Sequence, residues 1–119
     1  MSTLRVNTIQ NQAGTGQPSI TGLAQAWVNF NGTGTVAIRA SFNVTSITDG
    51  GTGIYTANLT NPVADANGAV TSGGFYFSGF NSNGESIQCA LETTSAVRIR
   101  TGNVNATLDF AFVSISVFR

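Results

Sequence analysis

Apolar and polar residues alternate with a period of two along much of the chain after residue 25. The longest stripe of apolar positions predicts one continuous strand and consists of Val36, Ile38, Ala40, Phe42 and Val44. Such alternation is the pattern of a β-strand that buries one face. Further strands are expected at residues 26–30, 55–59, 75–80, 87–91 and 96–100. Helix-forming segments are almost absent, so the chain is predicted to be all-β.

Clusters of Gly, Asn, Asp and Ser separate the predicted strands. The segment Asp49–Gly53 is typical of a β-hairpin turn, because glycine supplies the positive φ values that such a turn requires. Asp65–Gly68 and Asn81–Glu85 are expected to be turns as well. About seven strands with regularly spaced turns predict an antiparallel, jelly-roll-like β-sandwich over residues 25–119.

The last predicted strand changes the phase of its apolar positions. They are first even and then odd: Leu108, Phe110 and Phe112, followed by Val113, Ile115 and Val117. The change leaves two alternatives open. Either a β-bulge lies near Phe112–Val113, or the second half of this strand is buried on both faces.

The first 24 residues follow a different pattern. Two short apolar patches flank a polar, glycine-rich connector; they consist of Leu4, Val6 and Ile9 before it, and Ile20 and Leu23 after it. Neither patch is long enough to bury itself. We therefore expect residues 1–24 to be an extended segment for attachment or oligomerisation, which packs on the sandwich or on other chains.

Composition narrows the classes of function. Charged residues make up 8% of the chain, against roughly a quarter in an ordinary soluble domain. The formal net charge is zero and there is no Lys, so binding to nucleic acid is not expected. The chain also has no His, which is the commonest general base and metal ligand. We predict neither an enzyme nor a cofactor, and so weakly charged a surface favours self-association.

Membrane insertion and secretion are not expected either. No apolar run approaches the roughly 18 residues of a membrane span, and the first residues, MSTLRVNT, lack the apolar stretch of a signal peptide. The single cysteine, Cys89, lies between apolar residues of a predicted strand and is expected to be a small buried hydrophobic residue.

The few charged residues do not form an evident site. Asp49 and Asp65 stand beside glycines as in calcium loops, but a calcium site needs six to eight oxygen ligands, so we expect turns. Glu85 and Glu92 are separated by seven positions at predicted turns and are not expected to act as an acid–base pair. Arg98 and Arg100 should project from one strand face. They are expected to form a solvated face or an interface ion pair, with an anionic polysaccharide as the alternative partner.

Two parts of the chain resemble known proteins. Ser2–Gln10 and Ser19–Leu23 resemble the N-terminal segments of phage tail-fibre and appendage proteins. Ala26–Val44 with Ser46–Leu59 is similar to a module of virion structural proteins in marine phages and cyanophages. The resemblance implies a homotrimeric virion fibre, assembled in the host cytoplasm and mounted on other virion proteins by its N-terminus. It also implies a distal knob that meets the host surface, and it implies no catalytic residues.

Several residues are candidates for contacts. Trp27 is the only Trp and is expected to anchor the core or a subunit interface, with stacking on a sugar ring as the alternative. Aromatic residues occupy both faces of Phe75–Phe80, which is typical of a core or an interface, and the Tyr76 hydroxyl is a candidate ligand contact. The next turn could form an exposed tip that contacts the host, through Asn81, Ser82, Asn83 and Gly84.

Two other functions stay open at this stage. A head-attached fibre or capsid decoration protein would use the same N-terminal segment for mounting. A free carbohydrate-binding module would be a monomer with Trp27 and Tyr76 exposed. In the fibre and in the binding module, a surface glycan is the candidate ligand.

Overall fold

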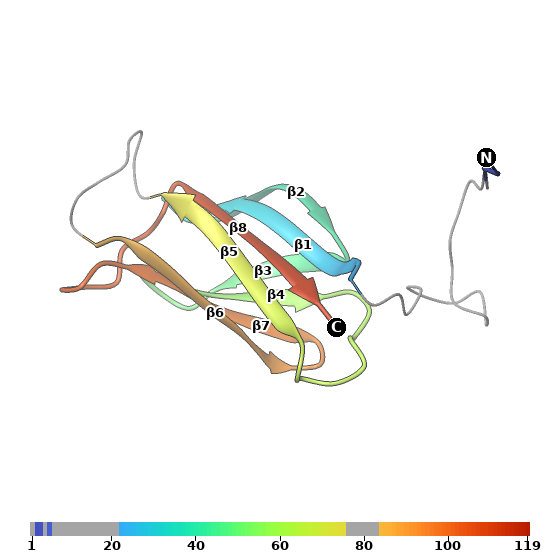
Figure 1. The fold of residues 1–119 in the computed structure, drawn as a ribbon. Helices are drawn as coiled ribbons and strands as arrows, with labels where there is room; N and C mark the ends of the chain where they lie inside the picture. Colours follow the sequence, from blue (N-terminus) through green and yellow to red (C-terminus); the bar gives the residue numbers. More distant parts are fainter. Residues whose placement is uncertain (1, 4, 6–21, 76–83) are drawn as a thin grey trace.

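The computed structural model describes residues 2, 3, 5, 22–75 and 84–119, which form eight β-strands and no helix. The strands are β1 (Ala24–Asn31), β2 (Ala37–Phe42), β3 (Val44–Asp49), β4 (Ile54–Leu59), β5 (Ala69–Phe75), β6 (Ser86–Thr93), β7 (Ala96–Gly102) and β8 (Phe112–Phe118). They build two four-stranded antiparallel sheets, β2-β1-β8-β5 and β3-β4-β7-β6, which pack face to face (Figure 1). The predicted all-β sandwich is confirmed.

The core lies between the two central strand pairs. In β1 and β8, every second side chain points inward and is buried: Ala26, Val28 and Phe30, and Val113, Ile115 and Val117. From β4 and β7 the buried apolar residues are Tyr55, Ala57 and Leu59, and Val97 and Ile99. Full burial of one such large apolar side chain contributes about 1.5–3 kcal/mol. The four outer strands contribute mostly half-buried side chains, so the central pairs hold the sandwich together.

The long apolar stripe is not one strand, and that prediction is wrong. The chain leaves the first sheet at Phe42 and enters the second at Val44, with Asn43 between them at a φ of 56°. The Asn43 amide nitrogen donates to the carbonyl oxygens of Gln25 and Asn61, each at 3.0 Å, and its Oδ1 accepts from the Asn61 N–H at 2.7 Å. These bonds fix a corner that period-two alternation does not reveal.

Strand β5 begins six residues before the predicted strand at 75–80. Its segment Thr71–Gly74 is small and weakly apolar, so it carries no clear alternation. It nevertheless pairs with β8 from Ala69 to Phe75 in an unbroken antiparallel register. Apart from Phe75, the predicted strand 75–80 lies outside the described residues.

The phase change near Phe112 has neither of the two expected causes. β8 begins at Phe112, so Leu108 and Phe110 belong to the loop before it, where Phe110 is buried. The pairing of β8 with β5 contains no register shift. The second half of β8 buries one face only, since Ser114 and Ser116 are half-buried on the other.

The N-terminal segment is described only in part. Leu4, Val6, Ile9 and Ile20 lie outside the described residues, and β1 already begins at Ala24. Leu23, just before this strand, is 47% exposed. No helix in the described ranges is long and apolar enough to cross a membrane.

Candidate functional site

The outward side of the sheet β2-β1-β8-β5 carries five aromatic residues, which we call the aromatic face. They are Trp27, Phe42, Phe75, Phe112 and Phe118. Trp27, Phe42 and Phe112 are 37%, 40% and 40% exposed, and the other two are half-buried. Large aromatic side chains dominate the energetics of protein interfaces. Because five of them lie together on the outside of one sheet, this face is the candidate interaction surface.

Strand register explains why these rings share one face. Trp27 on β1 is paired with Phe42 on β2 and Ser116 on β8, so the three side chains project to the same side. At the other end of the sheet, the Phe75 and Phe112 rings stack with centroids 4.6 Å apart. Residues between the two ends are small or polar, and Asn29 donates to the Ser114 hydroxyl at 2.7 Å. The aromatic face therefore has aromatic rings at both ends and small or polar side chains between them.

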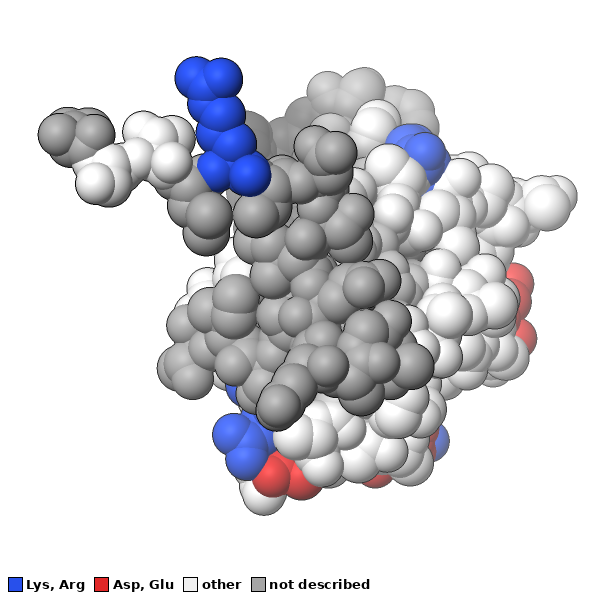
Figure 2. Space-filling view, turned by 90° about the vertical axis from the view of Figure 1, so that its right-hand side faces the viewer, with Lys and Arg blue, Asp and Glu red and all other residues white. Residues whose placement is uncertain are grey.

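The aromatic face carries little charge. Among the described residues on it, Arg39 is the one charged side chain, and its guanidinium lies over the Phe112 ring. Among the atoms that are not grey in Figure 2, the charged side chains form small separate spots. Two copies that met through such a face would not repel each other electrostatically.

The outward side of the second sheet has the opposite chemistry. Asn58 donates to the hydroxyls of Ser46 and Thr48 at 3.0 and 2.9 Å, which ties β4 to β3 on this side. Arg98 forms an ion pair with Glu92 at 2.9 Å, and Arg100 is exposed beside it. The sandwich thus has one polar side and one aromatic side.

A buried polar network connects the loops at one end of the sandwich. The Tyr55 hydroxyl lies 2.7 Å from Asp109 Oδ1 and 3.0 Å from the Gly32 carbonyl oxygen, and the Gly53 N–H donates to the same Asp109 oxygen at 2.7 Å. Burial, and then the hydrogen bond to the carboxylate, raise the pKa of the Tyr55 phenol above its ordinary value. The phenol therefore stays protonated and acts as a donor that holds the loops together.

Gly53 shows how closely these loops approach. Its φ is +67°, and a Cβ at this position would lie 2.4 Å from the Thr101 carbonyl oxygen. Only glycine satisfies both the backbone conformation and this contact. The predicted Gly-rich turn is thus also a packing site for the chain before β8.

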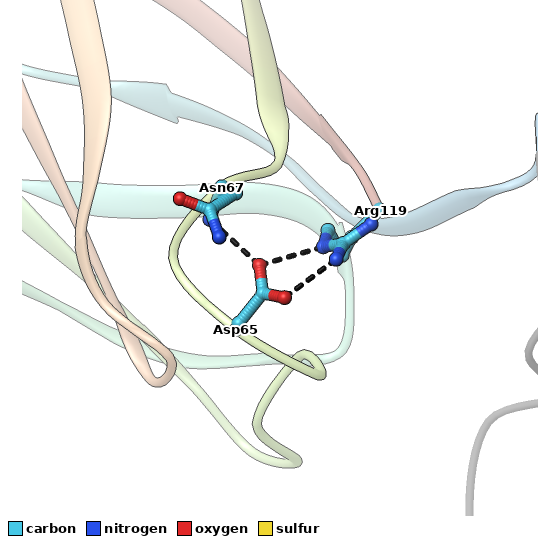
Figure 3. Close-up of polar contacts among 3 residues, drawn as sticks. All are labelled: Asp65, Asn67 and Arg119. Atoms are coloured by element: carbon cyan, nitrogen blue, oxygen red, sulfur yellow. Dashed lines mark hydrogen bonds and ion pairs between the residues drawn. The ribbon is translucent and has the colours of Figure 1, made fainter.

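The aspartates of the two predicted turns accept hydrogen bonds from backbone N–H groups of the same turn, as expected. Asp49 accepts from the Gly51 N–H at 2.9 Å, and Asp65 accepts from the Asn67 N–H at 2.8 Å. Asp65 also binds the Arg119 guanidinium through both of its oxygens, at 2.7 and 2.5 Å (Figure 3). Within the described ranges, no three Cys, Asp or Glu residues cluster closely enough to hold a metal ion.

The structure places only some of the candidate contact residues. Tyr76, Asn81, Ser82 and Asn83 lie outside the described residues, while Gly84 is exposed just before β6. Trp27 is on the aromatic face and not in the core. Cys89 is half-buried, with its Sγ 3.9 Å from the Val70 carbonyl oxygen.

Sequence reasoning missed most of the aromatic face. Phe42 was part of the continuous stripe, and Phe112 was grouped in the last predicted strand with Leu108 and Phe110, which lie in the loop before β8. A usable signal was the composition of β8, because its odd positions are all aliphatic while its even positions are Phe, Ser, Ser and Phe. Comparison with protein families, with characterised proteins and with solved structures gives no match.

Proposed function

We propose that this chain is a non-catalytic structural subunit that assembles with copies of itself through the aromatic face. In this proposal it forms a small homotrimeric tail fibre or similar appendage of a phage virion. The observation that carries the proposal is the aromatic face itself, with Trp27, Phe42 and Phe112 each more than one-third exposed. The setting comes from the resemblance of Ser2–Gln10, Ser19–Leu23, Ala26–Val44 and Ser46–Leu59 to phage appendage and virion proteins.

The size of the face supports a second copy as its occupant. Four strands of about seven residues cover on the order of 24 by 19 Å. That is roughly 450 Å² on each copy, so two copies would together bury close to the roughly 1,000 Å² expected of a specific interface. Identical subunits usually form closed symmetric assemblies, and in the trimer that the resemblance implies the three aromatic faces would meet around the threefold axis, away from water.

The charge pattern also supports self-association. Arg39 is the one charged group among the described residues of the face, and its charge already lies against an aromatic ring. Between the two groups of rings, Asn29 and Ser114 already form a hydrogen bond to each other. An identical apolar face finds matching chemistry, and no charge is left to be desolvated without compensation.

A free carbohydrate-binding module is the second candidate, and the exposure of Trp27 favours it. The Trp27 ring has hydroxyl and amide groups near it, from Ser116 and Asn29. A sugar could therefore stack on the indole and bind these groups. This candidate requires a monomer, which separates it from the fibre.

The experiment is a mass measurement by light scattering during gel filtration of the full chain. We expect about three times the chain mass of 12.3 kDa. The double variant Trp27→Ser/Phe42→Ser should elute as a single chain with its β-sheet circular dichroism retained. Ile54→Ser is the matched control, because Ile54 is 42% exposed on the other sheet; it should leave the mass unchanged. A wild-type protein that stays monomeric at tens of micromolar would refute self-assembly and favour the binding module.

Placement on the particle needs a separate test. Antibody labelling of purified virions, viewed by electron microscopy, should place the chain at a tail or head appendage; a head location would favour the head fibre or decoration protein. Deletion of residues 1–24 should abolish its incorporation into particles. Incorporation of the truncated chain at the normal level would show that this segment does not mount the protein.

A further inference from the structure

A polar depression of about 310 Å³ lies on the sandwich beside the edge strand β6, away from the aromatic face. Its floor includes Ser86 and Gln88 of β6 and Arg100 of β7. Its wall is the turn after β7, with Asn103 and Val104. We infer that this depression binds the carboxylate of an acidic sugar, such as a uronic acid unit of a surface polysaccharide.

The strand register brings the floor residues together. Gln88 is directly opposite Arg100, and Ser86 is directly opposite Gly102. Opposite side chains in an antiparallel pair have Cβ atoms about 4.5–5.5 Å apart, so the amide and the guanidinium can contact one ligand. Gly102 has no side chain, so the backbone of the turn packs directly on it: a Cβ at this position would lie 2.4 Å from the Ala106 carbonyl oxygen.

The wall adds hydrogen-bond donors. Asn103 Oδ1 accepts from the N–H groups of Asn105 and Ala106, at 2.9 Å each, which fixes the turn. Its Nδ2 group has no hydrogen-bond partner within the described part of the chain. At the rim, Val104 is 82% exposed and provides an apolar surface for the C–H side of a ring.

Arg100 is the group that selects for an anion. The ion pairs among the described residues are Arg98 with Glu92 and Arg119 with Asp65, so Arg100 keeps an unpaired charge. A guanidinium presents two parallel N–H groups that match both oxygens of a carboxylate. One unpaired cation suits a singly charged carboxylate better than a doubly charged phosphate.

The remaining chemistry suits a sugar. Two amides and a hydroxyl around one cation offer both donors and acceptors, as the hydroxyl groups of a saccharide require. The volume is at the lower end of the roughly 300–1,000 Å³ found for ligand sites, which suits a single sugar unit. The biological setting rests on the proposed function: assembly through the aromatic face leaves this side of each copy open, and several weak sites on one particle then bind a polymer with high avidity.

The test is titration of the full chain with a short oligogalacturonate, measured by calorimetry, with a neutral galactose oligomer of equal length as the comparison. We expect binding in the millimolar range for the acidic oligomer and about tenfold weaker binding for the neutral one. Arg100→Gln should weaken binding of the acidic oligomer about tenfold. Arg98→Gln, which removes a neighbouring cation from the same sheet, should change it less than about twofold.

Three results would overturn the assignment. These are no heat from the wild-type chain at 10 mM oligogalacturonate, an equal loss in both arginine variants, or full displacement of the sugar by equimolar inorganic sulfate. The molar mass of the Arg100→Gln assembly is measured in parallel by light scattering, and it should equal that of the wild-type assembly. Failure of sugar binding is then distinct from failure of self-assembly.

Discussion

The guanidinium of Arg39 lies 4.3 Å from the centroid of the Phe112 ring, on the outward side of the sheet β2-β1-β8-β5. It also donates to the Ala111 carbonyl oxygen at 2.7 Å and approaches Asn29 Oδ1 at 3.4 Å. Because β1 lies between β2 and β8, this one side chain crosses a strand and connects three neighbours. The contact also holds the one charge of the aromatic face against a ring.

Arg39→Lys tests this contact. Lysine keeps the charge but lacks the planar fork that contacts the ring, the carbonyl and the amide together. We expect the free energy of unfolding to fall by about 1–2 kcal/mol, the combined size of one exposed cation–π contact and one hydrogen bond. Urea denaturation measures the change. Arg98→Lys, which alters an exposed ion pair on the other sheet, is the control, and equal midpoints for the two variants would contradict the assigned role of Arg39.

Asn43→Ala should be more harmful, because Asn43 combines a left-handed backbone with three side-chain hydrogen bonds. Alanine loses the bonds and strains the backbone, and we expect about 2–3 kcal/mol of destabilisation in urea. Asn43→Gly removes the same bonds without the strain, so it should be about 1 kcal/mol more stable than the alanine variant. Equal stability of the two variants would show that the backbone conformation at this corner costs nothing.

The central strands could be predicted because each buries one face and exposes the other. Ala26, Val28 and Phe30 are apolar for that reason, and the same holds for Val97 and Ile99 with the arginines beside them. Here the alternation in the sequence is a direct record of burial. The fold class and five of the strands follow from this alternation.

The missed features have no such local record. The corner at Asn43 keeps the two-residue period while it moves the chain to the other sheet. β5 contains two adjacent glycines and is held by its pairing with β8, which comes much later in the sequence. From the sequence, Phe42 and Phe112 are interpreted as core residues, because a pattern of apolar positions does not distinguish an exposed aromatic side chain from a buried one. Only the register of distant strands distinguishes them.

Tyr55→Phe tests the buried network. The variant keeps the edge-to-face packing of the ring on Phe30, whose centroid is 5.2 Å away, but it removes the donor to Asp109. We expect a loss of about 1–3 kcal/mol near neutral pH, because a half-buried carboxylate loses one of its hydrogen-bond partners. Thermal unfolding followed by circular dichroism measures the loss.

The same variant carries a dependence on pH. The pKa of Tyr55 is raised in the folded state, so the stability that the protonated phenol provides is complete below the unfolded pKa of about 10 and decreases as the pH rises above it. The wild type should therefore lose more stability than Tyr55→Phe between pH 9 and pH 11. Parallel losses in the two proteins would show that the phenol does not stay protonated in the fold.

The ion pair of Asp65 and Arg119 gives stability the opposite dependence on pH: its contribution is lost as the pH falls. Hydrogen bonds from the Arg119 side chain and then from the Asn67 backbone lower the pKa of Asp65 to about 2, below its ordinary value (Figure 3). The ion pair joins the residue after β8 to the loop between β4 and β5, and its contribution is present above the unfolded pKa of about 3.9. It is lost as the pH falls through the folded value, because a protonated carboxyl no longer attracts the guanidinium. Asp65→Asn should therefore lower the melting temperature at pH 6, and the difference from the wild type should shrink towards zero near pH 2.

Asp49→Asn is the matched control for Asp65→Asn, because Asp49 makes a similar turn hydrogen bond but has no ion pair among the described residues. Its melting temperature should follow that of the wild type across the whole pH range. A deficit in Asp65→Asn that persists undiminished at pH 2 would assign the effect to the turn geometry at Asn67. In that case the ionised pair with Arg119 would not be what holds the end of β8 to the loop.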